Sequence, residues 1–135
     1  MLTYRVLSAL ISYPAPELKG AAREGVRILC QEKLLRAEHI ERTCCFVDWL
    51  LDTPQLDVEA AHIDAFDRGR STSLHLFEHI HGESRARGEA MHCLLLRYPA
   101  HGLELQPGEL PDFLPLFLEF LSTRPGREAA KHLSE

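Results

Sequence analysis

Three side chains in the middle of the chain have the types and the spacing that zinc chemistry requires. His75, Glu78 and His79 form the sequence His-x-x-Glu-His, which matches the pattern of one class of zinc peptidases. On a helix, two imidazoles four residues apart share a face and can both contact one metal ion, while the carboxylate can act as a general base. The pattern therefore makes a zinc-dependent hydrolase one of the functions to weigh.

The competing interpretation is that these residues are polar groups at the end of a helix. A catalytic zinc ion also needs a third protein ligand, and His81, two residues further on, is poorly placed for that role. The adjacent His92 and Cys93 would point in different directions on a helix and do not predict a nucleophile with its base. Residues 67–73 could bind an anion at a helix start, but no lysine follows and no strand precedes, which excludes a P-loop. We therefore expect no metal, no cofactor and no enzymatic activity.

The histidines belong to a segment, residues 67–88, whose composition is unusual for the core of a helix bundle. Three glycines and several charged residues surround one short apolar run. Gly69 and Gly82 are expected to bracket a helix of about three turns between two tight bends. Opposite charges concentrated at these bends predict ion pairs that hold them in place. The expected members are Arg70, Glu78, Glu83 and Arg87.

The elements that must position this segment are helices. Apolar residues recur at helical spacing along the chain, and no stretch has the two-residue period of a strand. Glycine and proline mark the ends of the helices. The expected helices cover residues 2–11, 17–35, 37–52, 57–66, the run before Gly82, 83–98 and 112–121, and a short further helix begins at Arg127. This predicts an all-α fold, a single-domain bundle of about seven helices over residues 1–135.

The last long helix is expected to begin at Asp112 as its N-cap and is apolar on almost every side. Between residues 113 and 121 only Pro115 and Glu119 interrupt the apolar surface. Such a helix is either buried all round or lines a groove, and a lone carboxylate in an apolar groove suits a basic, apolar peptide. The predicted peptide-binding residues are Leu116, Phe117, Glu119 and Phe120, with Glu78 and Glu83 marking an alternative position for the groove.

Composition and charge exclude several classes of function. Fifteen basic against twenty acidic residues give a net charge of −5, which argues against nucleic acid as the main partner and suits a cationic peptide. No stretch approaches the roughly eighteen apolar residues of a membrane span, so no direct membrane insertion is expected. The cysteines at positions 30, 44, 45 and 93 have no C-x-x-C spacing. We expect them to be small buried residues in a reducing, cytoplasmic compartment.

Several stretches of the sequence together resemble a known family. Within residues 67–88 they are Asp67-Arg68-Gly69-Arg70-Ser71-Thr72-Ser73-Leu74, Leu76-Phe77-Glu78-His79, His81-Gly82-Glu83-Ser84-Arg85 and Arg87-Gly88. Leu10 with Tyr13-Pro14, His101-Gly102-Leu103, and Glu109-Leu110-Pro111-Asp112 with Leu114-Pro115-Leu116 and Leu118-Glu119 extend the match. This pattern resembles the NarJ-type nitrate reductase assembly chaperones over nearly the whole chain.

The resemblance implies an all-helical cytoplasmic chaperone that is related to the TorD and DmsD redox-enzyme maturation proteins. The implied partner is the N-terminal leader segment of the catalytic α subunit of membrane-bound respiratory nitrate reductase. The implied role is to assist molybdenum cofactor insertion and enzyme assembly without remaining in the finished enzyme. We expect such a chaperone to be a monomer or a weak dimer.

The resemblance also identifies a set of motif residues and two departures from the family pattern. The motif residues are Asp67, Arg68, Gly69, Arg70, Ser71, His79, His81, Gly82, Ser84, Arg87 and Gly88. His75 stands where the family carries an apolar residue, which weakens the zinc pattern. Members of the family continue well beyond residue 135, so we expect a truncated or short relative. The favoured function is a non-enzymatic chaperone, and the zinc hydrolase is the alternative.

Overall fold

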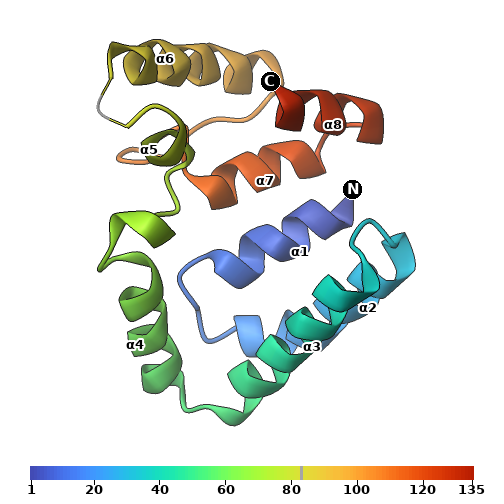
Figure 1. The fold of residues 1–135 in the computed structure, drawn as a ribbon. Helices are drawn as coiled ribbons and strands as arrows, with labels where there is room; N and C mark the ends of the chain where they lie inside the picture. The colour runs from blue at the N-terminus through green and yellow to red at the C-terminus, as the bar shows by residue number, and fades with distance from the viewer. Residues whose placement is uncertain (83) are drawn as a thin grey trace.

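The computed structural model describes residues 1–82 and 84–135, and over these residues it is built from helices with no strand (Figure 1). The α-helices are α1 (Leu2–Ile11), α2 (Leu18–Glu32), α3 (Ala37–Asp52), α4 (Gln55–Phe66), α5 (Leu76–Ile80), α6 (Arg85–Ala100), α7 (Leu114–Ser122) and α8 (Gly126–Ser134), with one 3-10 helix, η1 (Arg70–Thr72). None of these helices is long and apolar enough to span a membrane. The predicted all-α class is confirmed, with eight α-helices in the described residues rather than about seven.

Helix α1 lies between two apolar clusters. On one side Tyr4 is buried in the main core, with Leu7 and Ile11 packed against it. On the other side Leu10 packs against the smaller cluster that α2, α3 and α4 share. The main core consists of Tyr4, Leu94, Tyr98, Leu116, Phe117, Leu118, Phe120, Leu121 and Ala129, and the smaller cluster of Ala22, Val47, Leu50 and Val58. The first helix therefore joins the two halves of the chain.

Polar contacts fix both the start and the middle of α1. The Glu32 carboxylate, at the end of α2, accepts hydrogen bonds from the backbone N–H groups of Leu2 at 2.9 Å and Thr3 at 2.7 Å. These N–H groups have no partner within the helix, so a carboxylate from another helix acts as the cap. The Ser8 hydroxyl donates to the Pro115 carbonyl of α7 at 2.7 Å.

Most of helix α7 is buried, so the structure does not show the open apolar wall that the sequence analysis expected there. Leu116 and Phe117 are 7% and 8% exposed, and Phe120 is completely buried. Residues of α1, α6 and α8 cover different sides of this helix, so these side chains are core rather than an open apolar surface. Glu119 alone in the middle of α7 is exposed.

Several boundaries differ from those that the sequence predicted, for local reasons. Helix α2 ends at Glu32 instead of near residue 35, because Lys33 adopts a left-handed conformation with φ of 52°. The N-cap of α7 is Phe113 and not Asp112. Helix α6 continues through Pro99 to Ala100.

The prediction that the cysteines are buried is wrong. Cys30, Cys45 and Cys93 are exposed and Cys44 is partly exposed. Two of them are neighbours of completely or nearly buried residues, since Cys30 follows Leu29 and Cys93 precedes Leu94. One step along a helix turns a side chain by about 100°, which is enough to move it out of the buried stripe.

Helix α8 is held against α6 and α7 by two histidines and two arginines. The ring of His132 lies 5.2 Å from the ring of Phe120 and 6.1 Å from that of His101. Nη1 of Arg97 lies 3.1 Å from Nδ1 of His132, and Nη1 of Arg124 lies 3.0 Å from Nδ1 of His101. Because a guanidinium group can only donate, the Nδ1 atom is the acceptor in each of these two contacts.

We expect the stability of the fold to fall as the pH drops below about 6.5, the ordinary pKa of histidine. Burial and then the charge of Arg97 lower the pKa of His132, although Glu135 opposes them. Below the ordinary pKa the unfolded chain therefore binds more protons than the folded chain, and the free energy of unfolding falls with pH. Urea unfolding at pH 7.5 and 5.5 measures this. The decrease should be smaller in His132→Gln, and an equal decrease in both proteins would contradict the assignment.

Candidate functional site

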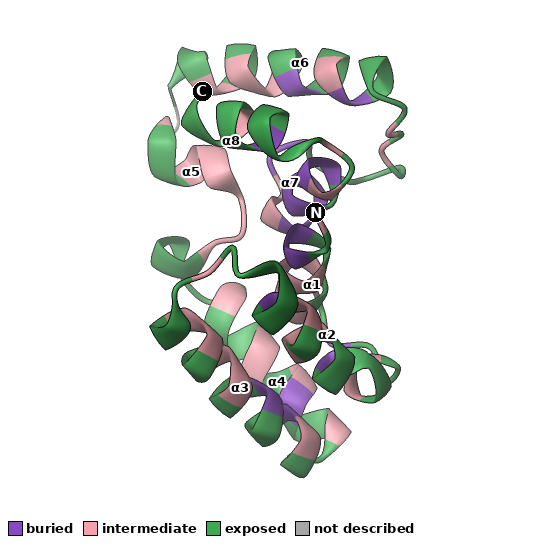
Figure 2. Ribbon diagram, turned by 90° about the vertical axis from the view of Figure 1, so that its right-hand side faces the viewer, coloured by how far each residue is buried: buried purple, intermediate pink, exposed green. Residues whose placement is uncertain are grey.

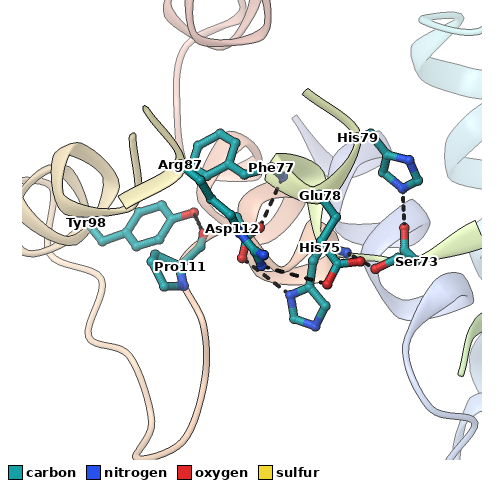
Figure 3. Close-up of polar contacts among 9 residues, drawn as sticks. All are labelled: Ser73, His75, Phe77, Glu78, His79, Arg87, Tyr98, Pro111 and Asp112. Carbon is teal, nitrogen blue, oxygen red and sulfur yellow. Dashed lines mark hydrogen bonds and ion pairs between the residues drawn. The ribbon is translucent and has the colours of Figure 1, made fainter. Parts of the chain in front are cut away.

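The motif segment, residues 67–88, is attached to the loop before α7 through the side chain of Asp112 (Figure 3). This side chain is completely buried. Its Oδ2 accepts a hydrogen bond from the backbone N–H of Phe77 at 3.1 Å, and its Oδ1 lies 3.3 Å from Nδ1 of His75. Phe77 is the second residue of α5, so Asp112 caps α5 from a distant part of the sequence instead of capping α7.

The backbone reinforces the same attachment. The N–H of Leu76 donates to the carbonyl of Asp112 at 3.0 Å, and the N–H of Leu114 donates to the carbonyl of Leu74 at 2.7 Å. An isolated antiparallel bridge pairs His75 with Phe113. Together with the Asp112 side chain, these bonds form what we call the Asp112 clamp.

Glu78 is the centre of the charged cluster in the motif segment. A hydrogen bond from Ser73 lowers the pKa of Glu78, and the charge of Arg87 lowers it further. Nη2 of Arg87 lies 3.7 Å from Oε1 of Glu78, so this part of the predicted ion-pair network is confirmed. Arg70 also contributes to the lowered pKa of Glu78. The predicted roles of Glu83 lie outside the described residues.

The bends around α5 differ from the prediction. Gly82 has φ of +55°, a conformation that favours glycine, whereas Gly69 has φ of −155°, which any residue adopts. Between them lie η1 and a five-residue α5 instead of a helix of three turns. The ring of His81 lies 5.4 Å from that of Phe77, and Arg68 pairs with Asp64 at 2.9 Å. The remaining motif residues Asp67, Ser71, Ser84 and Gly88 are exposed.

The zinc pattern does not produce a shared face for its two imidazoles. Helix α5 begins at Leu76, so His75 precedes the helix and its ring is held by Asp112. Nε2 of His79 instead contacts the carbonyl of Ser73 at 2.8 Å (Figure 3). Within residues 1–82 and 84–135, no three His, Cys, Asp or Glu side chains are grouped in a way that could hold a metal ion.

A different feature of the structure has the properties of a binding site, an apolar groove of about 480 Å³ between α1, α3 and α4. Helices α3 and α4 meet at a turn and diverge from it, with α1 across the open side (Figure 1). From α3 the groove is lined by Arg42, Thr43, Phe46, Trp49 and Leu50, and from α4 by Val58, Ala61, His62, Ala65 and Phe66. We call this hollow the α1–α3–α4 groove.

Large apolar side chains in the α1–α3–α4 groove are open to solvent. Phe46 is 39% exposed and Trp49 is 42% exposed, and their rings lie 5.7 Å apart. Of α3 and α4, only Val47, Leu50 and Val58 are buried (Figure 2). Contiguous exposed apolar surface of this kind marks an interaction site.

The groove also contains an aromatic and imidazole stack. The ring of His62 lies 5.6 Å from that of Tyr13 and 4.8 Å from that of Phe66. Burial lowers the pKa of His62, which keeps this ring neutral near pH 7 and preserves the apolar character of the α4 wall.

The segment of the two helices that frame the groove has a strongly negative net charge, whereas the rest of the chain does not. Residues 37–67 hold eight of the twenty acidic residues and one of the fifteen basic ones, a net charge of −7. The rest of the chain therefore holds twelve acidic and fourteen basic residues, a net charge of +2. None of these acidic residues is among those that line the groove, so their charge would act at longer range and favour the approach of a basic partner to an apolar site.

Sequence reasoning placed the groove on α7 and missed α3 and α4, although two signals were present. Phe46 and Trp49 are three residues apart and form a second apolar face of α3 beside the buried Val47 and Leu50. The concentration of acidic residues between positions 37 and 67 was the other signal. Neither signal shows that α4 diverges from α3, which is what opens the groove.

Known proteins match this chain over most or all of its length. A family model described as "Nitrate reductase delta subunit" matches residues 33–134. The chain is 42% identical over 135 residues to "Nitrate reductase molybdenum cofactor assembly chaperone NarJ" of Escherichia coli K12, which covers 100% of this chain and 57% of the relative. The chain is also 40% identical over 133 residues to "Probable nitrate reductase molybdenum cofactor assembly chaperone NarW" of the same strain. This match covers 98% of this chain and 54% of the relative.

A more distant relative comes from another bacterium. The chain is 31% identical over 141 residues to "Probable nitrate reductase molybdenum cofactor assembly chaperone NarJ" of Bacillus subtilis 168, covering 99% of this chain and 71% of the relative. The chain thus spans just over half the length of the two Escherichia coli relatives.

We expect the Asp112 clamp to contribute more to the order of the motif segment than its exposed ion pairs do. Asp112→Ala leaves the N–H of Phe77 without its acceptor in a buried site, which should cost about 1–3 kcal/mol. Arg87→Ala removes only a solvent-screened pair with Glu78 and should therefore have a smaller effect than Asp112→Ala. Hydrogen exchange across residues 74–81 measures both. Equal protection in Asp112→Ala and the parent would contradict the clamp.

Proposed function

Because this chain belongs to the nitrate reductase delta subunit family, we propose that it acts as a nitrate reductase assembly chaperone rather than as an enzyme. Its relatives are named as molybdenum cofactor assembly chaperones. In the proposal, the chain binds the N-terminal leader segment of the nitrate reductase α subunit and assists molybdenum cofactor insertion. It would act in the cytoplasm, as a monomer or a weak dimer.

The observation that carries this proposal is the α1–α3–α4 groove, whose walls are apolar and whose two helices α3 and α4 are rich in acidic residues. A leader segment with apolar anchors and a few basic residues has the complementary chemistry, and short amphipathic helices bind in grooves of this kind. Along α3 the lining extends from Arg42 to Trp49, which is about 10 Å and accommodates roughly two turns of a bound helix.

Phe46 and Trp49 are the side chains best suited to supply the affinity. Both are large and partly exposed in the free protein, so a peptide that covers them removes apolar surface from water. Aromatic residues at the centre of an interface usually carry much of its binding energy. The acidic side chains around the groove would contribute to the rate of association and to the choice of partner.

The alternative function, a zinc hydrolase built on His75, Glu78 and His79, has less support. His75 contacts Asp112 and His79 contacts Ser73, so the two imidazoles have separate partners. The names of the relatives point to assembly of a metalloenzyme and not to hydrolysis.

We expect Trp49→Ala to weaken binding of a synthetic peptide that comprises the first twenty residues of the nitrate reductase α subunit from the same organism. The dissociation constant should rise at least tenfold, which corresponds to about 1.4 kcal/mol or more, as for a central aromatic anchor. Isothermal titration calorimetry measures the change, and thermal unfolding confirms that the variant is folded.

Two control variants make this test specific to the groove. Leu96→Ala truncates another exposed apolar side chain, one on α6 that is 63% exposed, and should bind like the parent. Glu119→Gln removes the exposed charge of α7 and should also bind like the parent. If Glu119→Gln weakens binding and Trp49→Ala does not, the peptide binds at α7 as the sequence predicted, and the groove assignment is wrong.

A further inference from the structure

The two ends of the α1–α3–α4 groove differ in charge. At the turn that joins α3 to α4, Asp52, Asp57 and Glu59 lie within eight residues of one another, and residues 43–67 contain no lysine or arginine. Lys19 of α2 donates a hydrogen bond to the carbonyl of Thr53 in this turn. Three acidic residues and one cation are therefore located at or beside this turn, next to the groove residues Trp49, Leu50 and Val58.

The opposite end of the groove carries one cationic side chain. Arg42 lines the groove, and among the described residues no hydrogen bond or ion pair engages its guanidinium group. Its near neighbours Glu38 and Glu41 lie on the same helix. An unengaged guanidinium beside an apolar surface offers donors to carbonyl or carboxylate oxygens of a bound molecule.

A polar hollow of about 420 Å³ adjoins the groove where α4 ends. Phe66 lines both, and the polar hollow is also lined by Asp67, Arg68, Gly69, Arg70, Ser73, His75 and Glu78. Arg68 is paired with Asp64 of the preceding turn. Cations and carboxylates are thus mixed at this end, in contrast to the acidic turn.

The two ends of a bound helix also differ in charge. Its first turn presents free N–H groups, the positive end of the helix dipole and, in a leader segment, the α-amino group. Its last turn presents free carbonyl groups that accept hydrogen bonds from basic side chains. An excess of carboxylates near one end of the groove and the guanidinium group of Arg42 at the other therefore favour one direction of the helix over the other.

We propose that the groove fixes the direction of the leader helix, with the amino-terminal turn against Asp52, Asp57 and Glu59 and the carboxyl-terminal turn over Arg42. This inference rests on the proposed function and adds the polarity of the complex. In this direction the α-subunit chain that follows the leader leaves the groove beside the polar hollow. The motif segment, held in place by the Asp112 clamp, then lies next to the part of the partner that follows the leader.

Photo-cross-linking determines the direction of binding. The probe is the same twenty-residue leader peptide, with benzoylphenylalanine replacing either its second or its penultimate residue. Mass spectrometry then identifies the chaperone residues that each probe labels. The amino-terminal probe should label residues 50–59, and the carboxyl-terminal probe should label residues near Arg42 and residues 66–73. The reverse pattern, or labelling of both regions by each probe, would overturn the proposal.

Charge variants provide an independent measurement. Arg42→Gln should raise the dissociation constant of the peptide about threefold to tenfold, while Arg127→Gln, the same change at an exposed position on α8, should have no effect. Acetylation of the peptide's α-amino group should weaken binding to the parent by a similar factor and have less effect on Asp52→Asn/Asp57→Asn. Equal binding by Arg42→Gln and Arg127→Gln would contradict the proposed role of Arg42.

The outcomes separate this inference from the function on which it rests. A peptide that binds, loses affinity in Trp49→Ala and labels the chain in the reverse pattern leaves the chaperone function standing and overturns the direction. A peptide that does not bind at all overturns both. Cross-links between two copies of the chain at Trp49 would assign the groove to a dimer contact and would also overturn both.

Discussion

The packing of α1 on two sides at once is the constraint on which the rest of the structure depends. Its Tyr4 side belongs to the main core with α6, α7 and α8, and its Leu10 side belongs to the cluster of α2, α3 and α4. Capping by Glu32 and the bond from Ser8 to Pro115 fix its position against α2 and α7. Because both faces of α1 are used in this way, neither half of the chain can shift without exposing apolar surface of the other.

The same constraint leaves α4 with too little core to close onto α3. Val58 is the one buried residue of α4. The loop after α1 instead contacts α4, through Pro14 with Gln55 and Tyr13 with His62. The apolar faces of α3 and α4 therefore remain partly open, with Phe46 and Trp49 in solvent. Such a surface is costly for the free chain, and the apolar, basic helix that we propose as its partner would remove it from water. This account connects the fold to the chaperone function that we propose for a member of this family.

Local pattern predicted the helices well, but it did not predict what covers them. The helix over residues 37–52 was predicted to its ends, because its apolar period and the following Pro54 are local signals. The composition of α7 could not distinguish a groove wall from a core helix, since the distinction depends on Tyr98 and Ala129, which are distant in sequence. The short α5 depends on a cap from Asp112, 35 residues away, and no local pattern contains that information. The motif of residues 67–88 was enough to indicate the family. The groove, in contrast, could be located only from the angle between α3 and α4, which the sequence does not contain.

Fluorescence of Trp49 tests the central claim, that the α1–α3–α4 groove receives the leader peptide, most directly. It is the single tryptophan of the chain and is 42% exposed on the groove wall, so its emission reports on this site alone when the peptide contains no tryptophan. The account predicts a saturable shift of the emission to shorter wavelength as peptide is added, with the midpoint at the dissociation constant measured by calorimetry. Unchanged emission at a peptide concentration that calorimetry shows to be saturating would contradict it.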